Sequence, residues 1–326
     1  MKAPLVRFAL GLVGVVFALS CGGGGSSSPS PIAPPTTTTT TTTPPTSVWI
    51  SEGLRLTEVT AGLPGLGIAD AAVFQTSGGS WRMFFNVQDG FLRSATSPDG
   101  LAWTVDANKP FAVRGSVARF VRADSGHVRA FFACSQCPGG TTDDIHSAIT
   151  ADEGATWTIE DGIRVSSASV GASRLTGMSV VRTSDGRWRG YFAPQGGLPT
   201  TPIYSATSTD LLNWTLDSGT RLGPGRPLQG GAHPCAIFNS STGTTSLFYW
   251  RGAPDTYPVT VSTSTDGLTF TTETKITGLP GSINADPEVV RVGSGLRLYY
   301  NAGNETTGNI YSALNSTGTL AALGIR

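Results

Sequence analysis

The chain has 326 residues, of which 42 are glycine and 13% are charged, and its formal net charge at pH 7 is zero. This composition is typical of an all-β protein rich in turns. Because the sequence has no basic cluster, it argues against nucleic acid and anionic membrane surfaces as partners.

The first 20 residues are typical of a bacterial export signal. Lys2 and Arg7 flank the start of an apolar run, residues 8–19, which is too short to span a membrane as a helix. The small residues before Cys21 resemble a lipoprotein cleavage site, so we expect Cys21 to be lipidated and to become the first mature residue. Simple cleavage and release is the alternative.

A linker of Gly, Ser, Thr and Pro follows, so that residues 21–46 comprise the lipidated Cys and a segment that cannot bury a core. We expect this segment to be a disordered spacer. The N-terminal region therefore predicts an exported protein of the cell envelope, held by its lipid at the outer membrane or the cell surface.

From residue 47 to residue 326 the sequence repeats a short strand, a Ser/Thr-x-Asp turn and an aromatic residue. The aromatic residues recur roughly every 55 residues, which is typical of the blades of a β-propeller. The four segments are SATSPDGLAWT (94–104), SAITADEGATWT (147–158), SATSTDLLNWT (205–215) and VSTSTDGLTFT (261–271).

A second strand recurs five times, each time after a tight turn that predicts a hairpin. The fifth aromatic segment lies at the other end of the domain, where SVWISEGLRL (47–56) resembles the residues that follow the turns and supplies Trp49. We therefore predict a five-bladed β-propeller whose N-terminal strand completes the last blade. The five second strands are RMFFN (82–86), RAFFA (129–133), RGYFA (189–193), SLFYW (246–250) and RLYYN (297–301).

The acidic turns invite a catalytic interpretation, but TADEGATW resembles the sialidase-type Asp-box, S/T-x-D-x-G-x-x-W. That resemblance implies that the Asp accepts backbone hydrogen bonds and that the Trp packs between blades. A structural role is therefore favoured for Asp99, Asp152, Asp210 and Asp266.

Three cysteines follow Cys21. Cys134 and Cys137 are expected to form a local disulfide in an oxidising compartment. A metal site would need further ligands, and we expect none. Cys235 is expected to be a buried free thiol.

The first position of each innermost strand should lie near the channel axis. Aligning DAAVF, SVARF, GMSVV, HPCAI and DPEVV places Asp70, Ser116, Gly177, His233 and Asp286 there. Two carboxylates around one cavity suit glycosidic bond hydrolysis, so Asp70 and Asp286 are candidate catalytic residues. The alternative is that they cap local turns.

The third position of the same strands holds small residues except for Glu288, which makes Glu288 a further catalytic candidate. An ion pair with Arg174 or Arg291 is the favoured alternative. The loops at the same channel mouth supply candidate substrate-binding groups, with Trp250 as a sugar platform or as packing between blades. These candidates are His233, Trp250, Arg251, Asn301 and Glu305, beside loop residues Asn86, Asp89 and Gln195.

Two stretches, ADPEVVRVGSGLRLYYNAG (285–303) and YSATSTDLLNW (204–214), resemble five-bladed glycoside hydrolases of the arabinanase, xylosidase and invertase type. The resemblance implies a carbohydrate ligand, an oligosaccharide or polysaccharide, at the channel mouth, and glycoside hydrolysis if the protein is an enzyme. Those enzymes place three acids on three successive blades, and only Asp70 and Asp286 match here by position. We expect a monomer without a cofactor. The alternative is an inactive scaffold that binds a protein partner.

Overall fold

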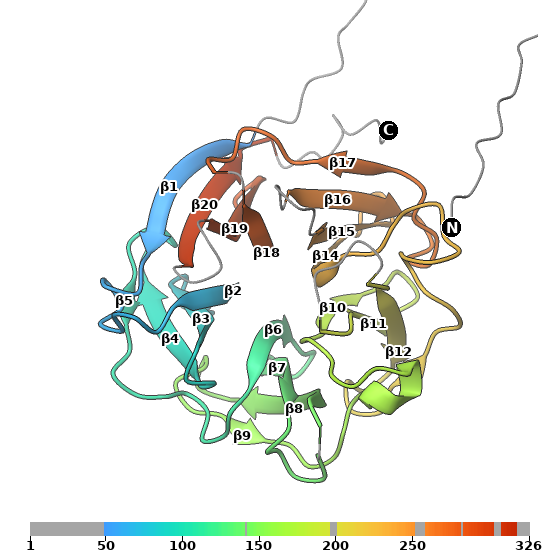
Figure 1. Cartoon of the computed structure of the whole chain (residues 1–326), viewed down its shortest axis with the longest axis horizontal. Helices are drawn as coiled ribbons and strands as arrows, with labels where there is room; N and C mark the ends of the chain where they lie inside the picture. Colours follow the sequence, from blue (N-terminus) through green and yellow to red (C-terminus); the bar gives the residue numbers. More distant parts are fainter. Residues whose placement is uncertain are drawn as a thin grey trace, which may run out of the picture. The chain divides into compact units, whose positions relative to one another are not determined.

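In this computed structural model the described residues are 49–140, 142–195, 201–251, 258–281, 283–302 and 308–317. They form five four-stranded antiparallel sheets arranged as blades around a central axis (Figure 1). The predicted five-bladed propeller is therefore confirmed. No helix within these residues is long and apolar enough to cross a membrane.

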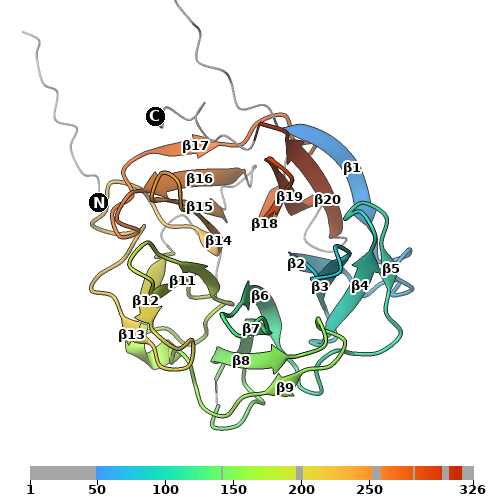
Figure 2. The same ribbon diagram turned by 180° about the vertical axis from the view of Figure 1, so that it is seen from behind.

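In the first four blades the strands follow chain order from the axis outward. The innermost strands β2, β6 and β14 of these blades and β18 of the fifth blade face the centre in both views (Figure 2). A short 3₁₀ helix, Ser167–Val170, precedes the third blade. The first blade is β2 (Ile68–Gln75), β3 (Trp81–Val87), β4 (Leu92–Ser97) and β5 (Thr104–Val105); the second is β6 (Ser116–Arg122), β7 (Val128–Cys134), β8 (Asp144–Thr150) and β9 (Thr158–Ile159). The third is β10 (Ser179–Arg182), β11 (Trp188–Phe192), β12 (Tyr204–Ser208) and β13 (Thr215–Leu216); the fourth is β14 (Ala232–Asn239), β15 (Thr244–Trp250), β16 (Val259–Ser264) and β17 (Glu273–Lys275).

The fifth blade joins the two ends of the domain. Its inner strands are β18 (Asn284–Val292), β19 (Gly295–Ala302) and β20 (Asn309–Asn315), and its outermost strand is β1 (Ile50–Leu56). Strand β1 pairs antiparallel with β20, with Ile50 opposite Leu314 and Leu56 opposite Ile310. The prediction that the N-terminal strand completes the last blade is confirmed.

The recurring aromatic residues pack between blades. Each lies against the aromatic residue of the second strand in the preceding blade, with ring centroids 5.5–6.3 Å apart. The same contact thus occurs at all five interfaces, including the one that closes the ring. The pairs are Trp157–Phe84, Trp214–Phe131, Phe270–Tyr191, Trp49–Phe248 and Trp103–Tyr299.

A recurring ion pair also links the second strand to the outermost strand within a blade. An arginine of the second strand pairs with an acidic residue in or beside the outermost strand at 2.8–3.2 Å, and in the fifth blade that acid is Glu52 of β1. The fourth blade has Ser246 in place of the arginine, and its acid, Glu273, pairs with Arg251 instead. The pairs are Arg82–Asp106, Arg129–Glu160, Arg189–Asp217 and Arg297–Glu52.

The cysteines are arranged as expected: Cys134 and Cys137 form a disulfide, and Cys235 is a buried free thiol. The four acidic turns, at Asp99, Asp152, Asp210 and Asp266, lie between the third and fourth strands of their blades. In each turn the Asp carboxylate accepts backbone hydrogen bonds, for example from Leu101 and Ala102 to Asp99.

Candidate functional site

The innermost strands of four blades begin with a β-bulge, and the bulge decides which side chains reach the channel. Register shifts occur in β2, β6, β14 and β18. The bulged residues have left-handed backbone angles, which non-glycine residues adopt rarely and which cluster at functional sites. They are Asp70 (φ 54°), Val117 (φ 52°), His233 (φ 47°) and Asp286 (φ 52°).

The bulge corrects the sequence alignment of the second blade. Val117, and not Ser116, is the counterpart of Asp70, and Arg119 rather than Ala118 is the counterpart of Glu288. The expectation for Ser116 was wrong because β6 carries the same bulge as the other strands but has the apolar Val117 there, so no polar side chain marks the position in the sequence.

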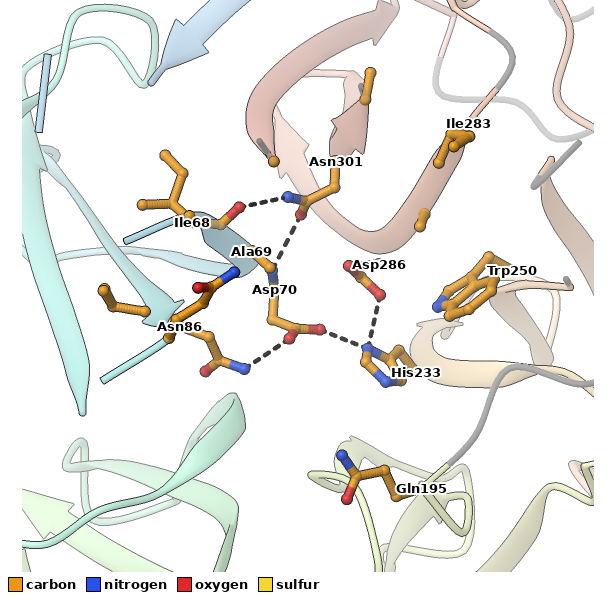
Figure 3. A pocket seen from close by; sticks show the side chains of 16 residues that line it. Ile68, Ala69, Asp70, Asn86, Gln195, His233, Trp250, Ile283, Asp286 and Asn301 are labelled. Carbon is orange, nitrogen blue, oxygen red and sulfur yellow. Dashed lines mark hydrogen bonds and ion pairs between the residues drawn. The ribbon is translucent and has the colours of Figure 1, made fainter. Parts of the chain in front are cut away.

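A cavity of about 550 Å³ opens at the starts of these strands (Figure 3). Asp70, His233 and Asp286 point toward one another on one side of it, and Trp250 lies beside His233 with ring centroids 5.9 Å apart. The three residues come from blades one, four and five. The closed ring therefore brings together side chains that are up to 216 positions apart in the sequence.

His233 bridges the two carboxylates through one nitrogen. Its Nδ1 lies 2.5 Å from Asp70 Oδ1 and 2.8 Å from Asp286 Oδ1. All three side chains are largely buried, with exposed fractions of 14% for His233, 8% for Asp70 and 12% for Asp286. Its other ring nitrogen, Nε2, faces away from both carboxylates (Figure 3).

Two asparagines hold Asp70 in place. Asn86 Nδ2 donates to Asp70 Oδ2 at 2.6 Å, and Asn301 Oδ1 accepts from the Asp70 backbone N–H at 3.0 Å. Asn86 also accepts from the Val117 N–H at 3.1 Å, and Asn301 donates to the Ile68 carbonyl at 3.0 Å. Each asparagine ends a second strand and satisfies the N–H of the bulge in the next blade.

The three ionisable groups shift each other's pKa. Burial alone would lower the pKa of His233, but the charges of Asp70 and Asp286 raise it to about 10. Burial alone would raise the pKa of Asp70, but the charge and hydrogen bond of His233 bring it below the ordinary value. Burial and the charge of Asp70 raise the pKa of Asp286. Carboxylates whose environments push their pKa values apart are typical of functional sites.

A second ionic layer is buried beside these residues. Glu288 Oε2 lies 3.3 Å from Arg119 Nε, and Glu288 Oε1 accepts from the Val73 N–H at 3.3 Å. Arg119 is only 2% exposed. The expected ion pair of Glu288 exists, but the predicted partners were wrong. Arg174 pairs with Asp143, and Arg291 donates to the Phe238 carbonyl.

Glu288 does not line the cavity, so the structure does not bring it together with Asp70 and Asp286. Arg251 does not line it either, and its guanidinium pairs with Glu273 at 2.8 Å. Asp89 is engaged by Arg93 at 2.5 Å. The remaining candidates among the described residues, His233, Trp250, Asn301, Asn86 and Gln195, do line the cavity. Glu305 and Cys21 lie outside the described residues.

The same three side chains also have the composition of a metal site. One ligand atom each from Asp70, His233 and Asp286 lies within 4.8 Å of the others. A metal ion would need an unprotonated His233 Nδ1. Here that nitrogen is already hydrogen-bonded to Asp70 and lies 2.8 Å from Asp286 Oδ1, so a protonated His233 supplies the positive charge that an ion would bring.

No family model matches the sequence, and no curated protein matches it either. Solved structures of glycoside hydrolases do share the fold. The catalytic domain of the Coprinopsis cinerea GH62 α-L-arabinofuranosidase matches with a TM-score of 0.63 and 12% identity, over 83% of this chain and 98% of that chain.

Two further structures match in the same way. An endo-arabinase from Bacteroides thetaiotaomicron has a TM-score of 0.61 and 14% identity, over 80% of this chain and 96% of that chain. A thermostable family-43 glycoside hydrolase has a TM-score of 0.56 and 13% identity, over 76% and 88%. The fold is thus that of the five-bladed glycoside hydrolases, as the sequence resemblance implied.

Proposed function

We propose that the cavity at the channel mouth binds carbohydrate and that its Asp70–Asp286 pair recognises the sugar without cleaving it. The observation that carries the proposal is the convergence of an indole, two carboxylates, an imidazole and side-chain amides on one cavity. Ligand cavities of this size combine an apolar surface with a few fixed polar groups.

Each group has a role that suits a sugar. The Trp250 ring offers an apolar face on which a pyranose can stack. His233 Nε2 and the Gln195 amide can donate to hydroxyl oxygens, and Asp286 can accept from hydroxyl groups. Because the asparagines and the bulges hold these groups in place, little ordering is needed when the ligand binds.

Hydrolysis by this pair is disfavoured by the geometry. A retaining glycosidase separates its carboxyl groups by about 5–5.5 Å with the sugar between them, and an inverting enzyme by about 6.5–9.5 Å. Here the imidazole nitrogen of His233 lies between Asp70 and Asp286, in contact with both. Both oxygens of Asp70 also accept a hydrogen bond, and the contact with the His233 imidazole weakens Asp70 as a nucleophile.

Titration calorimetry against a broad panel of oligosaccharides, neutral and charged, tests binding. We expect Trp250→Ala to weaken the affinity roughly tenfold, equivalent to about 1.4 kcal/mol, with an unchanged unfolding transition. Trp250→Phe is the matched control, because it keeps an aromatic face and should lose less. A panel without any binder, read on a folded protein, would refute carbohydrate recognition and leave the protein-binding scaffold as the alternative.

The same panel tests catalysis through the release of reducing ends. We expect no cleavage by the wild type, and Asp286→Asn to change binding alone. Robust wild-type hydrolysis that disappears in Asp286→Asn would show that the pair is catalytic.

We further propose that the propeller is exported and attached to the cell envelope by a lipid on Cys21. The export-type N-terminal sequence and the linker of residues 22–46 support this proposal. A sugar-binding domain on such a linker would be held away from the membrane surface, where it can reach polysaccharide.

A further inference from the structure

The charges of the cavity do not balance. Among the described residues that line it, the only ionisable side chains are Asp70, His233 and Asp286. With all three ionised they carry two negative charges and one positive charge. No lysine or arginine in the described lining supplies the missing positive charge.

The excess negative charge falls on Asp286. The Nδ1 proton of His233 is closer to Asp70, at 2.5 Å against 2.8 Å, and Asp70 also receives Asn86. Asp286 Oδ1 has no hydrogen-bond partner among the described residues, although it lies 2.8 Å from His233 Nδ1. Apart from His233, the cation that acts on the Asp286 carboxyl is Arg119, and its guanidinium is already paired with Glu288.

A largely buried carboxylate without a counter-ion is costly, so it either takes up a proton or pairs with a cation. Trp250 lines the same cavity beside His233 and Asp286 (Figure 3). A cation beside an indole face gains a further electrostatic attraction. Two independent features of the cavity thus favour a positively charged ligand group.

We infer that the ligand carries a protonated amino group that pairs with Asp286, and that the cavity selects amino sugars over neutral sugars and rejects uronic acids. This inference rests on the proposed function, because it names the class of carbohydrate that the same cavity binds. The ammonium supplies the missing positive charge, whereas a carboxylate on the sugar would face Asp286 without a cation between them.

The raised pKa of Asp286 supports this assignment and adds a second observable. Burial and the charge of Asp70 favour the protonated carboxyl in the free protein, while His233 and Arg119 oppose them. An ammonium favours the ionised carboxylate. Binding of an amino sugar should therefore lower the pKa of Asp286, and binding of a neutral sugar should not.

The test uses three oligosaccharides with the same β-1,4-linked backbone: a chitosan oligomer with free amines, its N-acetylated chitin counterpart and a cellulose oligomer. We expect the full chain to bind the chitosan oligomer roughly tenfold or more tightly than the others, the gain of one charge-assisted hydrogen bond. An NMR titration of the Asp286 carboxyl should show a lowered pKa with the chitosan oligomer alone.

Asp286→Asn should abolish this preference. Asp185→Asn is the matched control, since it removes one negative charge from an exposed hairpin turn outside the cavity. Equal affinity for all three oligomers would overturn the inference and leave carbohydrate binding standing, while no binding by any sugar would overturn the proposed function itself. Loss of the preference for the chitosan oligomer after chelator treatment would also overturn the amino-sugar inference, because the cation beside Asp286 would then be a metal ion.

Discussion

His233 owes its charge to two neighbours, and this has a consequence for stability. Its pKa is raised from 6.5 to about 10, since Asp70 and Asp286 outweigh the effect of burial. The folded state therefore keeps a proton that the unfolded state loses above pH 6.5. Its contribution to stability is complete below that pH and is lost as the pH rises through about 10.

We predict that the free energy of unfolding of the wild type falls between pH 6.5 and 9 and that His233→Gln removes this slope. The window ends below the ordinary pKa of the buried tyrosines. Denaturant titrations at several pH values measure both slopes. Parallel profiles for the two proteins would show that His233 is not held as an imidazolium.

His146 should act in the opposite direction. It lies on β8 with no measurable exposure, and neither ring nitrogen has a hydrogen-bond partner among the described residues. Burial lowers its pKa despite the nearby charge of Asp144. The folded state thus resists protonation, and stability is lost as the pH falls below 6.5.

We predict that His146→Phe reduces the loss of unfolding free energy between pH 6.5 and 5 relative to the wild type. Phenylalanine has a similar shape and takes up no proton. Thermal unfolding at both pH values measures the difference. An equal acid loss in the two proteins would contradict the prediction.

At the scale of single elements, the acidic turns act as joints between the third and fourth strands. Asp152 accepts hydrogen bonds from the Thr156 N–H at 2.9 Å and from the hydroxyls of Thr150 and Thr156 at 2.6 Å. Gly154 adopts a φ of 86° in the same turn, which favours glycine. The turn lies away from the residues that line the cavity.

We predict that Asp152→Ala lowers the free energy of unfolding by about 1 kcal/mol and leaves ligand affinity unchanged. The loss stays at the low end of the range for a broken hydrogen bond because Thr156 is exposed and water can replace the carboxylate. Calorimetry and denaturant unfolding of the same preparation separate the two effects. Lost binding with intact stability would give the turn a functional role.

The closing strand β1 is held by the aromatic contact that recurs in all blades and by the arginine–acid pair that recurs in all but the fourth. Trp49 is 4% exposed and packs edge-on against Phe248, and Glu52 pairs with Arg297 at 2.8 Å. We predict that Trp49→Ala costs about 3–5 kcal/mol, the range for emptying a large buried aromatic site, and that deletion of residues 47–56 unfolds the domain. A stable domain without residues 47–56 would contradict the role of β1 as the closing strand.

The repeats made the fold predictable from the sequence, because the same aromatic contact and hairpin recur in each blade. The site was only partly predictable. Asp70, His233 and Asp286 were found by aligning strand starts, since their blades carry the bulge at the same place. Arg119 was missed because β6 has the apolar Val117 at its bulge, so the predicted alignment of this strand began one residue early. The positions of Asn86 and Asn301 at the ends of FFN and YYN were the signal for their role in holding the bulges.

At the scale of the whole molecule, five similar blades build one asymmetric cavity. Blades four, five and one supply the charged side chains at the bulge, whereas blade two supplies Val117. In blade three Gly177 approaches the Val117 carbonyl so closely that a Cβ would lie 1.5 Å from its oxygen. Val117 in blade two and Gly177 in blade three thus place no ionisable side chain at this position, so the ionisable groups converge on one side of the axis.

The last prediction concerns attachment of this domain to the cell envelope. We expect wild-type protein expressed in bacteria to incorporate labelled fatty acid at Cys21. The protein should then sediment with membranes, because burial of an acyl chain in the bilayer stabilises binding by about 0.8 kcal/mol per CH₂ group. Cys21→Ala should abolish both, while Ser28→Ala in the linker should change neither. Deletion of residues 22–44 should leave the unfolding transition of the propeller unchanged, because this segment lacks the apolar residues needed for a core. Wild-type protein that is exported without the label would favour simple cleavage and release over lipidation of Cys21.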